Sequence, residues 1–223
     1  GVCNGTLKNC RNMAAVTLDV TATVAGACGV AGVAGLIGAT GRVENCSNTA
    51  FITLGSNVTG DKVSVGGVVA ETEAGAVVTG CSNEGGIASN GATPLDKKYN
   101  LYTGGVVGYA GGTVENCTTE GGKTIALKVT AAYNSYTGGI VGCADGAVTG
   151  CTNKQPLSIM ANRYNSDGEA CRYAYIGGVA GKTAGALSDS KNRGAISAAA
   201  ICKFVIMGGI VGSADGAVSN VVN

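Results

Sequence analysis

The sequence predicts an all-β protein that coils into a parallel β-helix, or β-solenoid, with six to seven rungs of about 35 residues each. One reason is composition: glycine supplies 39 of 223 residues and aromatic residues only 4%, while 45% of the chain is hydrophobic. The core must then consist of Val, Ile, Ala and Cys, which suit β-strands. The other reasons are a recurring phrase and the lack of any 3.6-residue helical period. Because parallel crossovers are almost always right-handed, we expect a right-handed coil.

The recurring phrase is Gly-x-Val-x-x-Cys-x-Asn. Its seven copies are 31 to 39 residues apart and begin at Gly5, Gly41, Ala76, Gly112, Gly146, Gly185 and Gly216. A Gly-Gly-Val/Ile-Val-Gly phrase, or a close variant, precedes six copies and begins at Gly35, Gly66, Gly104, Gly138, Gly177 and Gly208. Each repeat therefore holds three short apolar segments separated by turn residues. Because one such unit cannot bury its inward face alone, the repeats must stack on a shared core.

The Cys position of the phrase is predicted to be small and to face inward. It is occupied by Cys10, Cys46, Cys81, Cys117 and Cys151, and then by Ser190 and Val221. Cysteine is readily buried as a small hydrophobic residue, which favours free thiols here. Rungs ~4.8 Å apart also permit disulfides between neighbouring rungs, and these remain the alternative. Cys171 and Cys202 share a different repeat position and are the best candidates for a disulfide.

The position two residues after the Cys predicts an asparagine ladder. It is occupied by Asn12, Asn48, Asn83, Asn153 and Asn192, with Asn223 in the last copy and Thr119 as the exception. Asparagine tolerates the left-handed backbone of a tight turn, and we expect the ladder residues to use it. Stacked carboxamides can also form hydrogen bonds from one rung to the next.

The two recurring phrases resemble those of a known family. The Gly-Leu-Ile-Gly at Gly35 and the related phrases, each followed by Gly-x-Val-x-Asn-Cys/Ser, resemble the GLUG-type repeats of bacterial surface proteins. The resemblance covers essentially the whole chain, although Cys is much commoner here than the usual Ser and only one copy has the literal phrase. It implies a secreted or cell-surface location and a structural or adhesive task.

Several kinds of chemistry are disfavoured. The sequence has no histidine, which removes Ser-His-Asp and Cys-His catalysis and histidine-ligated metals. It has no Cys-x-x-Cys, and we expect neither a metal nor a cofactor. A net charge of +1 without a basic block predicts no nucleic-acid partner. Residues 20–41 are uncharged and as long as a membrane span, but their second half follows the repeat, so we expect no membrane insertion.

Tyrosines form the best candidate binding site. Tyr102, Tyr136 and Tyr175 lie three residues before the second glycine of consecutive Gly-Gly phrases, and Tyr99 and Tyr133 lie six residues before it. On stacked rungs they would form two aligned columns that can stack on sugar rings and form hydrogen bonds to sugar hydroxyls. The alternative is an aromatic stack that only stabilises the sheet.

Carboxylates are the remaining candidates for acid–base chemistry. Asp145 and Asp215 recur within Ala-Asp-Gly-Ala-Val, and Glu44 and Glu115 recur within Val-Glu-Asn-Cys. We expect each pair to lie two rungs apart, at roughly 10 Å, which slightly exceeds the separation that inverting glycosidases use. Turn formation and a solvated face account for them instead.

We therefore expect residues 1–223 to form a single β-solenoid domain that is not an enzyme. Both chain ends fall inside a repeat without a recognisable polar cap, which predicts a segment of a longer array or surface protein, or end-to-end self-association. The expected role is a stalk or adhesin module, extracellular or on the bacterial cell surface, with a glycan or host extracellular matrix as partner. Two alternatives stay open: a self-assembling filament subunit, and a glycan-active β-helix lyase or hydrolase.

Overall fold

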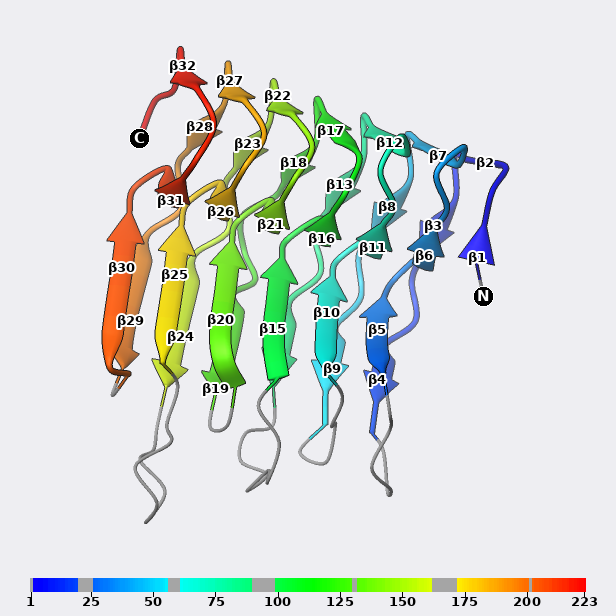
Figure 1. The fold of residues 1–223 in the computed structure, drawn as a ribbon. Coiled ribbons are helices and arrows are strands. Elements are labelled where there is room, and N and C mark those ends of the chain that lie inside the picture. Colours follow the sequence, from blue (N-terminus) through cyan, green and yellow to red (C-terminus); the bar gives the residue numbers. More distant parts are fainter. Residues whose placement is uncertain are drawn as a thin grey trace.

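The computed structural model of this chain describes residues 2–19, 26–55, 61–89, 99–129, 132–161, 172–200 and 202–223. Within these residues the chain forms 32 β-strands and no helix. The strands make five parallel sheets, named A to E here, that run side by side along the coil (Figure 1). This confirms the predicted all-β solenoid with parallel strands.

Sheets E and A carry the longer strands. In spatial order, sheet E consists of β5 (Ala27–Ala31), β10 (Lys62–Gly66), β15 (Tyr99–Gly104), β20 (Ala132–Gly138), β25 (Tyr173–Gly177) and β30 (Phe204–Gly208). Sheet A consists of β1 (Val2–Cys3), β6 (Ala34–Ile37), β11 (Val69–Thr72), β16 (Val107–Ala110), β21 (Val141–Ala144), β26 (Ala180–Thr183) and β31 (Val211–Ala214). The glycine-rich phrases lie where a strand of sheet E passes into sheet A.

Sheets B, C and D complete each turn. Sheet B consists of β2 (Thr6–Lys8), β7 (Arg42–Glu44), β12 (Val77–Thr79), β17 (Thr113–Glu115), β22 (Val148–Thr149), β27 (Leu187–Ser188) and β32 (Val218–Ser219). Sheet C consists of β3 (Arg11–Asn12), β8 (Ser47–Asn48), β13 (Ser82–Asn83), β18 (Thr118–Thr119), β23 (Thr152–Asn153) and β28 (Lys191–Asn192). Sheet D consists of β4 (Val16–Leu18), β9 (Ile52–Leu54), β14 (Ile87–Ser89), β19 (Ile125–Val129), β24 (Leu157–Ala161) and β29 (Ile196–Ala200).

One turn of the coil passes through sheets E, A, B, C and D in that order. In Figure 1 the strands of sheet E run upward in front, those of sheet D run downward behind them, and the chain advances from right to left, which makes the coil right-handed. About five complete turns separate the first and last strands of six-stranded sheet E. The expected six to seven rungs is thus a slight overestimate, because the described chain enters and leaves the coil partway through a turn.

Hydrophobic side chains inside the coil form two cores. One packs beneath sheets A and B and contains Val78, Cys81 and Val107, and the other lies between sheets D and E and contains Val63 and Ile87. Between the two cores, the second glycine of each Gly-Gly phrase lies against the ladder residue of its own turn, which is an asparagine except at Gly105, where it is Thr119. The two recurring phrases of the sequence therefore meet at the narrow middle of every turn.

Left-handed backbone occurs one residue before the Cys position. Positive φ values of 52° to 54° are found at Asn9, Asn45, Asn116, Asp189 and Asn220, and Gly80 and Gly150 have positive φ at the same position. Asn, Asp and Gly are the residues that tolerate this conformation. The expectation that the ladder asparagines adopt it is wrong, because residues such as Asn48 and Asn83 lie in the extended strands of sheet C.

Candidate functional site

Three tyrosines form a continuous stack on the outer face of sheet E. In-register pairing of β15, β20 and β25 aligns Tyr102 with Tyr136 and Tyr136 with Tyr175. The ring centroids are 5.0 Å apart in the first pair and 5.1 Å apart in the second, with interplanar angles of 8° and 3°. Because side chains alternate between the two faces of a strand, the neighbouring Leu101 and Thr103 point into the core. We call these three residues the tyrosine column.

The stacking determines which part of each ring a ligand can reach. The nearly parallel rings turn their faces toward one another. Each tyrosine is only partly buried, so the column presents ring edges and hydroxyl groups to solvent. A sugar ring therefore cannot lie flat between neighbouring tyrosines, and recognition through the column would use hydroxyls and edges.

The predicted second column is not found at Tyr99. This residue is only 8% exposed and packs in the core between sheets D and E. A register shift between Tyr99 and Asn100 pairs Tyr99 with Ala132, so Tyr99 does not lie opposite Tyr133. The side chain of Tyr133 lies outside the described residues.

Three further aromatic residues extend the stack, and the sequence analysis missed them. Tyr173 stacks on Tyr175 at 5.7 Å and on Phe204 at 5.0 Å, and Tyr109 of sheet A meets Tyr102 edge to face at 5.2 Å. Tyr173 and Phe204 both lie five residues before the second glycine of a Gly-Gly phrase, a position occupied by asparagine in the two preceding repeats. Alignment at that position would have found them.

Charged groups flank the column where sheets E and A meet. The Lys62 ammonium lies 3.4 Å from the Tyr109 ring centroid and 2.6 Å from a carboxylate oxygen of Glu71. Such a cation held over an aromatic face is stabilised by the ring quadrupole. Further along, the Tyr109 hydroxyl donates to Asp145, and Lys182 pairs with Asp215 at 3.0 Å. The charges of Glu71 and Asp215 are each balanced by a lysine, whereas Asp145 accepts from a neutral hydroxyl. The pairing with Asp215 raises the pKa of Lys182.

Burial keeps the neutral groups of this face protonated. Desolvation raises the pKa of Tyr102, Tyr109 and Tyr136 above the usual value for a phenol. Burial also raises the pKa of the Cys143 thiol to about 12. Cys143 lies between Tyr109 and Lys182 in sheet A and is 7% exposed. Near neutral pH the face therefore carries phenolic hydroxyls and a neutral thiol.

The recurring carboxylates lie two rungs apart. Ala184 occupies the equivalent position on the turn between those of Asp145 and Asp215. In sheet B, Thr79 lies between Glu44 and Glu115. Asp145 accepts from Tyr109 while Asp215 pairs with Lys182, and Glu44 pairs with Lys8 and Arg42. The geometry thus gives each of these three carboxylates a partner of its own and does not join them into an acid–base pair.

The cysteine column lines the core beneath sheets A and B. Cys46, Cys81, Cys117 and Cys151 are buried free thiols, and Cys10 at the first turn is a partly buried one. The thiol of Cys151 donates to the carbonyl of Thr149 at 3.4 Å, and its three buried counterparts make the same contact to the residue two before them. Ser190 makes the equivalent bond at 2.8 Å. Either a thiol or a hydroxyl can therefore satisfy this carbonyl.

The asparagine ladder is a directional chain of hydrogen bonds. The Nδ2 atom of each donor reaches Oδ1 on the next turn: Asn12 to Asn48 (2.7 Å), Asn48 to Asn83 (2.8 Å), Asn153 to Asn192 (2.8 Å) and Asn192 to Asn223 (2.8 Å). Thr119 is too short to continue the chain from Asn83. Instead Gln155, which is fully buried, reaches back across Thr119 to Asn83 (3.4 Å) and to the Gly85 carbonyl (2.8 Å).

Other sequence expectations concern residues outside this face. Cys171 lies outside the described residues, so the Cys171–Cys202 disulfide remains a prediction. Among the residues that the structure describes, no three Cys, Asp or Glu side chains gather in a way that would hold a metal ion. The described residues also contain no helix with the length and apolar character of a membrane span.

Comparison with protein families matches residues 99–126 to Glug, the GLUG motif. This segment is a GLUG-type repeat. Comparisons with curated proteins and with solved structures give no significant match. The GLUG motif runs from β15 through β18 to the first residues of β19 and so covers one turn of the coil. It includes Tyr102, Gly105 and Cys117, whose equivalents recur on other turns, and the chain is therefore a β-solenoid repeat module.

Proposed function

We propose that this GLUG-containing solenoid is a non-catalytic module of the bacterial cell surface, a stalk or adhesin repeat that binds glycan through the tyrosine column. The observation that carries the proposal is the unbroken column of Tyr102, Tyr136 and Tyr175 on a rigid sheet. A protein that served only as a stalk would not need any of these rings to contact a ligand.

Hydroxyl groups repeated at the rung spacing suit a partner that is rich in hydroxyls. Beside the column, Asn134 donates to Asn100 at 2.9 Å, which adds carboxamides to the row of phenols. The side chains are ordered before binding by stacking and in-register strands, so little conformational entropy is lost when a ligand docks. Glycans, including those of host extracellular matrix, match this chemistry.

A glycan and matrix-protein array tests the proposal. The Tyr136→Ala variant is expected to lose binding, and Tyr136→Phe is expected to lose most of it, because Phe keeps the stack but removes the hydroxyl. Met160→Ala is the matched control, since Met160 is a large exposed residue on sheet D. Unchanged binding in both Tyr136 variants would refute recognition through the column, and a blank array for the parent chain would favour a stalk.

The same array separates a binding module from a glycan-active enzyme. We expect every bound glycan to be recovered intact. The local partners of Asp145 and Asp215 support this expectation, because neither carboxylate is poised against the other. Product release that disappears in Asp145→Asn or Asp215→Asn would establish the enzyme instead.

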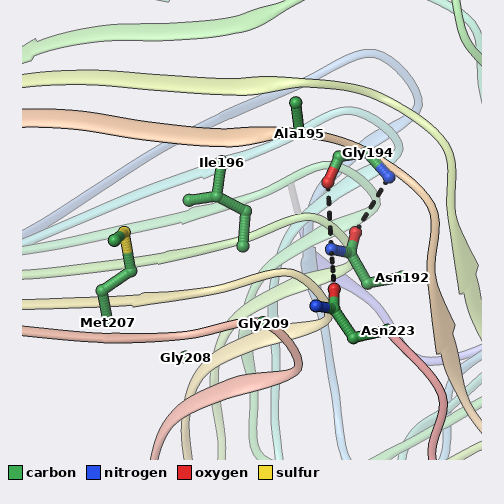
Figure 2. A pocket seen from close by; sticks show the side chains of 8 residues that line it. All are labelled: Asn192, Gly194, Ala195, Ile196, Met207, Gly208, Gly209 and Asn223. Atoms are coloured by element: carbon green, nitrogen blue, oxygen red, sulfur yellow. Dashed lines mark hydrogen bonds between the residues drawn. The ribbon is translucent and has the colours of Figure 1, made fainter.

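A second candidate function is end-to-end self-association, which the last turn favours. The final strand of sheet E, β30, exposes Phe204 (44%), Val205 (43%) and Met207 (54%). Figure 2 shows the adjoining pocket, in which Asn192 donates to Asn223, and no described residue accepts a hydrogen bond from Nδ2 of Asn223. At the other end, Oδ1 of Asn12 accepts only the Ala14 amide among the described residues. The last turn thus offers a donor, and the first turn an acceptor.

Sedimentation over a concentration series tests this association. The chain is expected to form larger species as its concentration rises, and Val205→Lys with Met207→Lys is expected to prevent them by charging the exposed edge. Met160→Lys, on the side of the coil, serves as the control. A chain that stays monomeric over the series argues against association.

The surface location rests on the resemblance to GLUG-type repeats of surface proteins. An antibody raised against this chain is expected to label intact cells of its source organism, and protease added to those cells is expected to remove the signal. Labelling only after cells are permeabilised would contradict the location.

A further inference from the structure

The tyrosine column places phenol rings close enough to react with one another. Tyr102, Tyr136 and Tyr175 stack with centroids 5.0 and 5.1 Å apart. The pairs sit on neighbouring strands as direct Cα partners. Two phenols held in this way do not need to diffuse together, which gives their reaction a high effective concentration.

The surroundings favour a particular kind of oxidation. The rings are partly exposed, so a one-electron oxidant can draw electrons from their edges. Phenols are protonated at neutral pH, and burial raises the pKa of Tyr102 and Tyr136 further, so each loses a proton together with an electron. The product is a neutral tyrosyl radical next to a second tyrosine.

We propose that the tyrosine column is an oxidative cross-linking site, at which a one-electron oxidant such as peroxidase with hydrogen peroxide joins Tyr136 to Tyr102 or Tyr175 as dityrosine. Each phenol gives one electron to the oxidant and its hydroxyl proton to water. The two radicals form a carbon–carbon bond between ring positions ortho to the hydroxyls. The ortho hydrogens then leave as protons while both hydroxyls regain theirs. Overall, two C–H bonds break, one C–C bond forms, and two electrons and two protons are lost.

The cross-link would join consecutive turns of the coil. Tyr102 and Tyr136 are 34 residues apart in the sequence, and Tyr136 and Tyr175 are 39 apart. Closing such a loop restricts the unfolded chain as a disulfide does, so the bond should raise the melting temperature. On a protein exposed to oxidants, this reaction would strengthen the solenoid rather than damage it. The inference does not depend on glycan binding.

Cys143 is expected to compete with the cross-link. It lies close enough to the column for its charge to act on the pKa of both Tyr102 and Tyr136. A thiol can transfer a hydrogen atom to a tyrosyl radical, which restores the phenol and leaves a thiyl radical. Cys143→Ser removes this pathway and should increase the yield of dityrosine.

The test treats the dilute 223-residue chain with peroxidase and hydrogen peroxide and reads dityrosine fluorescence and peptide mass. Cleavage at Lys98, Lys123, Lys128, Lys154, Arg172 and Lys182 places the three tyrosines in separate tryptic peptides. The expected product comes from the monomer and joins the Tyr136 peptide to the Tyr102 or Tyr175 peptide, with the loss of two hydrogen atoms. Fragmentation of the joined peptides identifies the linked rings.

Two variants keep the test decisive. Tyr136→Phe keeps the stacked ring but cannot form the phenoxyl radical, so both cross-links should disappear. Tyr99→Phe alters a buried tyrosine on β15, the strand of Tyr102, and should leave the yield unchanged. Dityrosine that maps only to other tyrosines, that occurs only between separate chains, or that persists in Tyr136→Phe would overturn the proposal.

Discussion

Gly139 lies against the carboxamide of Asn153, so that a Cβ atom at Gly139 would be 2.2 Å from Cγ of the asparagine. The contact closes the middle of the turn, where sheet E passes into sheet A and faces sheet C. It explains why the Gly-Gly phrase and the Asn position recur with the same period. Each needs the other in order to separate the two cores.

Substitution of Gly139 by alanine is expected to destabilise the protein by about 1–3 kcal/mol, because the added methyl group overpacks a rigid interior. Gly35→Ala is the matched control: a Cβ there would have no heavy atom within 4 Å. Urea denaturation of both variants checks the prediction, and equal stabilities would show that the close approach at Gly139 relaxes without cost.

Gln155 bridges the break that Thr119 makes in the ladder. Replacing Gln155 with leucine should cost about 1–3 kcal/mol, since it removes two buried hydrogen bonds, one from Nε2 to the Gly85 carbonyl and one from Asn83 to Oε1. The neighbouring Lys154 pairs with Glu120 at 3.0 Å in a half-exposed position, and Lys154→Ala should change the free energy of unfolding by only about 0.5 kcal/mol. A Gln155→Leu variant as stable as the parent would contradict the bridging role.

Two buried threonines should respond to valine in opposite directions. The hydroxyl of Thr137 is buried in sheet E and finds no hydrogen-bond partner among the described residues, so Thr137→Val should stabilise by about 1 kcal/mol. The hydroxyl of Thr119 donates to Asn153, so Thr119→Val should destabilise by about 1–3 kcal/mol. Thermal melts of the two variants should shift apart, and a shift of both in the same direction would count against this assignment.

Alkaline pH should weaken the fold through Cys143. Its folded pKa is raised from 9.0 to about 12, so between these values the unfolded state releases the proton that the folded state keeps. The contribution is complete below pH 9 and is lost as pH rises toward 12, at up to about 1.4 kcal/mol per pH unit. Denaturation of the parent and of Cys143→Ser at pH 8 to 11 measures this slope. The variant should fall less steeply, and parallel slopes would exclude Cys143 as the source.

Much of the fold could be predicted because the repeats are read directly from residue spacing. The positions of Cys46 and Asn48 on successive turns follow from the period, and Tyr102, Tyr136 and Tyr175 follow from their common distance to the Gly-Gly phrase. The second tyrosine column was wrongly predicted at Tyr99, because side chains alternate along β15 and a residue three positions before Tyr102 faces the core. Asn45 and its equivalents hold the left-handed backbone, which the composition of that position, Asn, Gly or Asp, could have indicated.

The parallel coil, the stacking of its repeats and the column of three tyrosines follow from the amino-acid sequence, because strand alternation and a constant period depend on local spacing alone. The folded structure was needed to show that the tyrosine rings turn their faces toward one another, that Lys62 lies over the first of them while it pairs with Glu71, and that Gln155 crosses a turn to complete the ladder. Each of these depends on where a side chain extends after the turns have stacked, and residues as far apart as Gly85 and Gln155 meet only in the folded coil.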